Sequence, residues 1–170
     1  YIITLHNISD SNVTFSQNST WDGSTSVDIP LTILNDDTTW SITPTMSNSS
    51  PVISANEGSS SDTLYTFHIT RPNGGNNYSG AATVTWEIVS SNGHTISDND
   101  IQGGLGTRKA SIGSGNFDTT VSFYVKADYV AEFDENFQVR LVSVDHGIID
   151  STTANNTIDF TALNDDTTVE

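Results

Sequence analysis

The sequence predicts an all-β fold, an antiparallel Greek-key β-sandwich of the immunoglobulin-like kind with about seven strands per repeat. Three observations support this prediction. Apolar and polar residues alternate in many short segments, helical periodicity is nearly absent, and clusters of Gly, Asn, Pro and Ser separate the segments. Short alternating strands at this spacing are typical of an antiparallel sandwich.

Seven segments supply the strands, beginning with a short apolar run and including one weakly patterned segment, the fourth. In chain order they are 52–55, 64–70, 83–89, 109–112, 121–126, 137–144 and 157–163. Alternate residues of a strand share one face, so each segment predicts its own contribution to the core. The expected inward-facing residues are Tyr65, Phe67 and Ile69; Val84, Trp86 and Ile88; Ala110 and Ile112; Val121, Phe123 and Val125; Phe137, Val139 and Leu141; and Ile158, Phe160 and Ala162.

An internal repeat sets the expected domain boundaries. The residues Leu-Asn-Asp-Asp-Thr-Thr at 34–39 recur at 163–168. We therefore expect 1–37 to hold the last two strands of a preceding repeat, one ending near Leu5 and the other at Val27–Leu34. Residues 38–166 form one complete repeat, and 167–170 begin the next. Two strands alone cannot bury an apolar face, so the first segment docks on the full repeat, exchanges strands with another chain, or stays poorly ordered.

Composition restricts the classes of partner. The chain has 170 residues, with 21 acidic against 5 basic ones and a formal net charge of −16. This charge argues against nucleic acid and anionic membranes as partners, and no stretch approaches the roughly 20 apolar residues of a membrane span. The chain has no cysteine, so we expect a staple other than disulfides or thiolate–metal sites, such as a hard cation held by oxygen ligands.

The acidic residues are expected to gather at one end of the sandwich. Loops of an antiparallel module alternate between its two ends, which assigns ten carboxylates to one end and three to the other. Ca²⁺ takes six to eight oxygen ligands, whereas Mg²⁺ uses fewer protein ligands, so this density predicts bound Ca²⁺. The ten are Glu57, Asp62, Asp98, Asp100, Asp128, Glu132, Asp134, Glu135, Asp165 and Asp166; the three are Asp118, Asp145 and Asp150.

The order of the acidic motifs resembles the Calx-beta family over residues 38–166. The matching motifs are Asn56-Glu57-Gly58, Asp98-Asn99-Asp100-Ile101 with Gly106-Thr107, the run from Asp128 to Phe137, and the Leu-Asn-Asp-Asp that closes each repeat. The resemblance implies a β-sandwich with Ca²⁺ bound at one end. The implied ligands are the carboxylates of Glu57, Asp100, Asp128, Glu132, Glu135, Asp165 and Asp166 and the backbone carbonyl of Val130, with Asp98 and Asp134 as further candidates nearby.

Two departures from the family pattern affect the expected ion count. Ala127 stands where the best calcium-binding members have another acid, and Thr167 stands where they have a third aspartate. We therefore expect one or two weakly held ions, with a degenerate site that binds nothing as the alternative. Asp36 and Asp37 match the last two ligand positions of the preceding repeat, whose other ligands lie outside this sequence.

The sequence thus predicts a calcium-binding extracellular repeat, a Ca²⁺-stiffened extender or adhesion segment of a secreted or cell-surface protein, with neighbouring repeats as its partners. No motif of nucleophilic or phosphate chemistry occurs, so an enzyme is not expected. One alternative is a module that recognises a glycan or a protein, with calcium only structural and Trp21 or Trp40 exposed. Another is a regulatory calcium sensor. The dispersed His6, His68, His94 and His146 show no metal-ligand spacing.

Overall fold

The computed structural model of the protein describes residues 13–15, 31–33, 38–74 and 77–167. The chain divides into two compact units, Tyr1–Asp36 and Asp37–Glu170. In the first, β1 (Val13–Phe15) pairs antiparallel with β2 (Leu31–Ile33). The strand expected near Leu5 lies outside the described residues, as do 168–170. The assignment of 1–37 and 167–170 to neighbouring repeats therefore stays a prediction.

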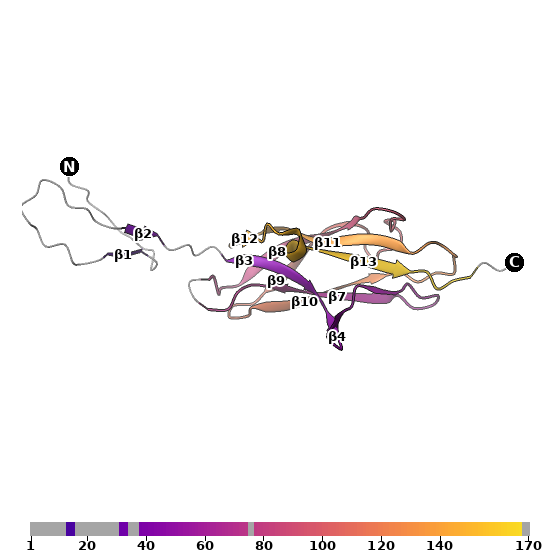
Figure 1. Ribbon diagram of the computed structural model, residues 1–170, viewed down its shortest axis with the longest axis horizontal. Helices are drawn as coiled ribbons and strands as arrows, with labels where there is room; N and C mark the ends of the chain where they lie inside the picture. Colours follow the sequence, from indigo (N-terminus) through magenta and orange to yellow (C-terminus); the bar gives the residue numbers. More distant parts are fainter. Residues whose placement is uncertain (1–12, 16–30, 34–37, 75–76, 168–170) are drawn as a thin grey trace, which may run out of the picture. The chain divides into compact units, whose positions relative to one another are not determined.

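The second unit is a β-sandwich of two sheets, visible as two layers in Figure 1. One sheet has the strand order β10-β7-β3-β12 and the other has the order β6-β13-β11-β8-β9. The chain changes sheets between β7 and β8, between β9 and β10 and between β10 and β11, which is a Greek-key connectivity. The strands are β3 (Thr39–Pro44), β6 (Ser54–Asn56), β7 (Thr63–Thr70), β8 (Ala82–Ser90), β9 (Gly106–Ile112), β10 (Asp118–Val125), β11 (Glu135–Val144), β12 (Ile148–Ile149) and β13 (Thr157–Leu163).

The expected alternation is confirmed in the core. Of the seventeen residues expected to face inward, all but Ala110 and Val121 are buried, and these two pack half-buried against the core. Tyr65, Phe123, Phe137 and Phe160 form an aromatic cluster with ring centroids 5.4–6.1 Å apart. The cluster joins the first residues of β7 and β11 to the last residues of β10 and the middle of β13. It therefore supports one end of the sandwich from within.

Two features of the first strands differ from expectation. The sequence predicts 52–55 as the opening strand, but β3 precedes it and joins the opposite sheet by pairing with β7. Trp40 and Ile42 of β3 are 0% and 1% exposed, so their alternation was a strand signal. Trp40, exposed under the glycan-recognition alternative, instead lies within the core, and its indole N–H donates to the carbonyl of His146 (2.7 Å).

The edge strands also depart from a wholly antiparallel sandwich. β6 pairs in parallel with β13, and β12 pairs in parallel with β3. The chain between β3 and β6 crosses from one sheet to the other through the hairpin of β4 (Met46–Ser47) and β5 (Ser50–Pro51). After this crossing, β6 runs in the same direction as β13, so the two strands pair in parallel.

The one helix in the described part of the chain, α1 (Thr153–Asn156), has four residues. None of the described helical structure has the length and apolarity needed to span a membrane.

Candidate metal centre

The acidic residues do converge at one end of the sandwich. Glu57 follows β6, Glu135 opens β11, and Asp165 and Asp166 follow β13. Three more lie in the connections from β8 to β9 and from β10 to β11, namely Asp100, Asp128 and Glu132. Strand direction thus brings together segments that are more than 100 residues apart, Glu57 and Asp166 being the extreme pair.

The tightest group consists of Glu57, Asp165 and Asp166. One carboxylate oxygen from each lies within 4.8 Å of the others. Opposite ligands of one Ca²⁺ are about 5 Å apart, since each Ca–O distance is about 2.3–2.6 Å. The spacing therefore suits oxygens that share one cation.

The parallel pairing of β6 with β13 places this group. Asn56 is in register with Leu163, and the backbone N–H of Glu57 donates to the carbonyl of Leu163 (3.0 Å). Two further hydrogen bonds hold the aspartates: Gly58 N–H donates to Asp165 Oδ1 (3.1 Å) and the Ser59 hydroxyl donates to Asp166 Oδ1 (2.8 Å). A parallel edge strand aligns the two chain segments at the same end, so the carboxylates meet without a long loop.

Glu57 is the most deeply buried member of the group, at 5% exposure. Burial, and after it the charges of Asp128, Glu132, Asp165 and Asp166, together raise the pKa of its carboxyl to about 7. These four neighbours come from two loops. Their effect on Glu57 shows that both loops share one electrostatic site.

The second half of the site surrounds Glu135. Burial, and after it the charges of Asp100, Glu132, Glu57 and Asp128, together raise the pKa of its carboxyl to about 7. Burial and then the charges of Asp100 and Asp128 also raise the pKa of Glu132. Beside Glu132 and Glu135 lies a cavity of about 270 Å³, lined further by His94, Thr95 and Phe133.

Three carboxylate oxygens in this site are buried and accept no hydrogen bond: Glu57 Oε1, Glu135 Oε2 and Asp166 Oδ2. Within the described residues, none of the ion pairs formed by Lys, Arg or His includes a member of the site. A buried charge without a partner costs several kcal/mol. The seven carboxylates of Glu57, Asp100, Asp128, Glu132, Glu135, Asp165 and Asp166, called here the acidic end, therefore fit a bound metal ion.

The other predicted ligands have different surroundings. Asp98 Oδ1 accepts a hydrogen bond from Leu105 N–H (2.8 Å), and Asp134 Oδ1 accepts one from Asn164 N–H (3.1 Å). Val130 is 55% exposed, and its N–H donates to Asp128 Oδ1 (2.7 Å). Asp98 and Asp134 thus brace the loops of the acidic end, and neither adds to the pKa shifts of Glu57 or Glu135.

Two supports of the site were not predicted. Asp62, expected only as one acid of this end, accepts a hydrogen bond from Ala127 N–H (3.1 Å) and so joins two loops. The ring of His94 stacks on Phe133, with centroids 4.0 Å apart, and joins two loops as well. Neither contact has a sequence signal, because both depend on loop conformation. Asp36, Asp37, Trp21 and His6 lie outside the described residues.

Comparison with solved structures identifies the fold. The chain is similar to the apo-form Calx CBD1 domain, with 18% identity, a TM-score of 0.54 and coverage of 76% of this chain and 99% of that one. It is similar to CBD12 from CALX1.2, with 20% identity, a TM-score of 0.52 and coverage of 67% of this chain and 42% of that one. It is also similar to the calcium binding domain CBD12 of CALX1.1, with 21% identity, a TM-score of 0.51 and coverage of 66% of this chain and 42% of that one. The sandwich has the Calx-beta fold.

The Calx-beta resemblance seen in the motifs is thereby confirmed at the level of the fold. The chain spans 42% of the length of the two CBD12 structures, so it corresponds to part of them. No family model matches the chain, and no match to a curated protein sequence was found. What the acidic end binds must therefore be argued from its own residues.

Proposed function

We propose that the acidic end binds Ca²⁺. The observation that supports this most directly is the set of three buried, unpartnered carboxylate oxygens on Glu57, Glu135 and Asp166. A hard cation would satisfy all three and relieve the mutual repulsion of the seven carboxylates. The similarity to the calcium binding domain CBD12 of CALX1.1 gives independent support.

Calcium fits the donor set better than other common metals. The candidate ligands are carboxylates and one backbone carbonyl, that of Val130, which are the oxygen donors that Ca²⁺ accepts at high coordination number. Mg²⁺ keeps more of its water and needs fewer protein ligands, and transition metals favour imidazole or thiolate. Ala127 and Thr167 supply no carboxylate, so we propose one or two ions.

We further propose that the chain is a calcium-stiffened extender or adhesion segment of an extracellular protein and not an enzyme. The recurring Leu-Asn-Asp-Asp-Thr-Thr supports a tandem array, and the acidic end lies beside its second copy. An ion held by four separate connections would tie together loops that otherwise repel each other. At extracellular, roughly millimolar calcium, a site with a dissociation constant of about 10⁻⁴–10⁻³ M would be about half to nine-tenths occupied.

A regulatory calcium sensor is the second candidate, favoured by the likeness to domains named for Calx. The two roles differ in affinity. Extracellular modules bind Ca²⁺ with dissociation constants of about 10⁻⁴–10⁻³ M, and sensors bind at about 10⁻⁷–10⁻⁵ M. A weak site supports the extender, and a tight site whose occupancy changes the loop conformation supports the sensor.

The test is thermal unfolding of the full chain in EDTA, in stepped CaCl₂ and in MgCl₂, with isothermal calorimetry for the affinity. We expect a Ca²⁺-selective rise in melting temperature that begins near the calorimetric dissociation constant and then grows with the logarithm of the calcium concentration. At 100-fold excess over that constant, the stabilisation is about 2.7 kcal/mol. No rise up to about 10 mM CaCl₂, above the range of extracellular modules, would refute calcium binding.

A further inference from the structure

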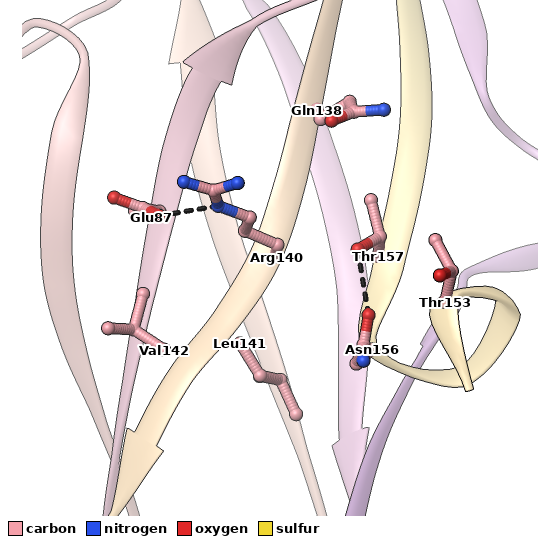
Figure 2. Close-up of a pocket in the computed structure, with 8 residues that line it drawn as sticks. All are labelled: Glu87, Gln138, Arg140, Leu141, Val142, Thr153, Asn156 and Thr157. Atoms are coloured by element: carbon pink, nitrogen blue, oxygen red, sulfur yellow. Dashed lines mark hydrogen bonds and ion pairs between the residues drawn. The ribbon is translucent and has the colours of Figure 1, made fainter. Parts of the chain in front are cut away.

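A second concave site lies on the outer face of the sheet that contains β8, β11 and β13, and none of its residues belongs to the acidic end. It is a groove of about 510 Å³, shown in Figure 2, with β11 as its floor. Glu87 of β8 stands on one side, and Thr157 of β13 with Thr153 and Asn156 stand on the other. This volume is within the range of about 300–1,000 Å³ typical of small-molecule sites.

Arg140 is the central polar group of the groove. In register it lies between Glu87 on β8 and Thr157 on β13. Its Nε donates to Glu87 Oε1 (2.5 Å), and no other described hydrogen bond uses its guanidinium. In Figure 2 the two terminal nitrogens stand clear of the Glu87 contact. The groove therefore presents a fixed, forked donor.

Two local features shape the groove. A β-bulge between Leu141 and Ser143 places Val142, which is 43% exposed, among the lining residues. Bulges commonly re-aim side chains next to functional sites. The helical wall is fixed by Asp150, whose carbonyl accepts a hydrogen bond from Asn156 Nδ2 (2.7 Å). The wall is thus tied to the sandwich and does not depend on the acidic end.

Donors and acceptors alternate along the lining. Arg140 offers donors, and Glu87 offers acceptors beside it. Gln138 donates from Nε2 to Asp159 (2.7 Å), which leaves its oxygen free to accept. The Thr153 hydroxyl both donates and accepts, and Val142 adds a small apolar surface.

This pattern selects among ligand classes. An anion would meet Glu87 and a net charge of −16, and a cation would meet Arg140. An apolar ligand would desolvate an ion pair at a cost of several kcal/mol. Neutral sugars present hydroxyls that donate and accept at once, together with ring C–H groups that pack on a residue such as Val142. We propose that this groove binds a neutral oligosaccharide.

The test is a titration of the ¹⁵N-labelled full chain followed by amide chemical shifts. The probes are the neutral trisaccharides cellotriose, maltotriose, mannotriose and N,N′,N″-triacetylchitotriose, with trigalacturonate as the acidic counterpart, each in EDTA and in CaCl₂. We expect at least one neutral probe to give saturable shifts at Glu87, Arg140, Val142 and Thr157, unchanged by EDTA.

Variants locate the binding. Arg140→Gln and Glu87→Gln each weaken the affinity about tenfold, the size of one charged hydrogen bond. Lys109→Gln is the matched control, because it removes a positive charge from the same sheet, opposite Thr85 and outside the groove. Melting temperatures confirm that all three fold.

Four outcomes would overturn the proposal. They are no saturable shift with any neutral probe, shifts with trigalacturonate alone, equal affinity in Arg140→Gln and the parent, and shifts confined to the acidic end and lost in EDTA. The last would mean that the sugar binds through calcium, which separates this proposal from the one above.

Discussion

The two ends of the sandwich bury charged side chains of opposite sign and surround them differently. At the acidic end, three buried carboxylate oxygens have no partner. At the other end, the buried charge is that of Arg71, which is 4% exposed. Its Nε and Nη2 donate to the carbonyl of Asn116 at 2.9 and 2.7 Å, and its guanidinium lies 5.1 Å from the Trp40 ring centroid. The buried charge of Arg71 is thus met mainly by the chain's own carbonyls and aromatic rings, with Nη1 left without a partner, whereas the acidic end presents only acceptors, which a cation from solution would satisfy.

The acids of the two ends differ in the same way. For Asp145, slight desolvation is outweighed by the N–H of Thr83 and by His146, so its pKa falls below the ordinary value. The pKa of Asp150 also falls, chiefly because Thr152 N–H donates to it. Glu57 and Glu135 instead have pKa values raised to about 7. Asp145 and Asp150 thus have partners within the chain, whereas Glu57 and Glu135, each with a buried oxygen that has no partner, are groups that we propose hold an ion.

The largest effect on stability is expected at the Arg71 end. Arg71→Met removes the donors to Asn116 and leaves carbonyls unpaired, which costs about 3 kcal/mol. Urea unfolding in EDTA and in CaCl₂ measures this loss. We expect the same loss in both solutions and an unchanged calcium affinity. A calcium affinity that falls with Arg71→Met would show that the two ends are coupled.

The next effect concerns the calcium response. Glu57→Gln removes one repelling charge, and its amide can donate to Asp165 or Asp166. We therefore expect the ion-free protein to melt higher than the parent, while the gain from CaCl₂, about 2–3 kcal/mol in the parent at saturating calcium, is largely lost. Asp118→Asn is the matched control, because Asp118 contacts His68 (3.0 Å) at the other end. A parent-like calcium response in Glu57→Gln would exclude Glu57 as a ligand.

The sequence predicted the acidic end because strand order alone decides which loops meet. Ten acids fell to one end, and seven of them share the electrostatic site. The family resemblance set Asp98 and Asp134 apart from those seven as further candidates, but loop placement alone could not, because the difference depends on which backbone N–H each side chain reaches. It also missed β3, whose pattern offers only Trp40 and Ile42. The groove beside Arg140 depends on a bulge and on a four-residue helix, and neither has a periodic pattern.

The pH dependence of stability is expected to follow from Glu57 and Glu135. Their folded pKa is about 7 against a model-peptide value of 4.5. A raised pKa stabilises the fold fully below about pH 4.5 and loses that stabilisation as the pH rises through 7. In EDTA the free energy of unfolding should therefore fall by about 2 kcal/mol between pH 5 and 8, allowing for partial solvent screening.

Calcium should reverse this trend, because it binds the ionised carboxylates and competes with protons. Urea unfolding at several pH values, with EDTA or with CaCl₂, measures both curves. Asp145 and Asp150, whose pKa values are lowered, titrate below this window and do not contribute to it. A free energy of unfolding in EDTA that stays constant from pH 5 to 8 would contradict the raised pKa values of Glu57 and Glu135.

The smallest effect distinguishes a ligand from a brace within the acidic end itself. Asp98→Ala loses the hydrogen bond to Leu105 N–H, which costs about 1 kcal/mol in EDTA and in CaCl₂ alike. Asp100→Ala removes a charge that raises the pKa of Glu132 and Glu135, so it should stabilise the ion-free protein slightly and weaken calcium binding. Calorimetry of the two variants side by side makes the comparison, with a change of less than about threefold in calcium affinity expected for Asp98→Ala. A tenfold loss of calcium affinity in Asp98→Ala would contradict this. It would mean that Asp98 breaks its hydrogen bond with Leu105 N–H to bind the ion, and that the acidic end rearranges when calcium binds.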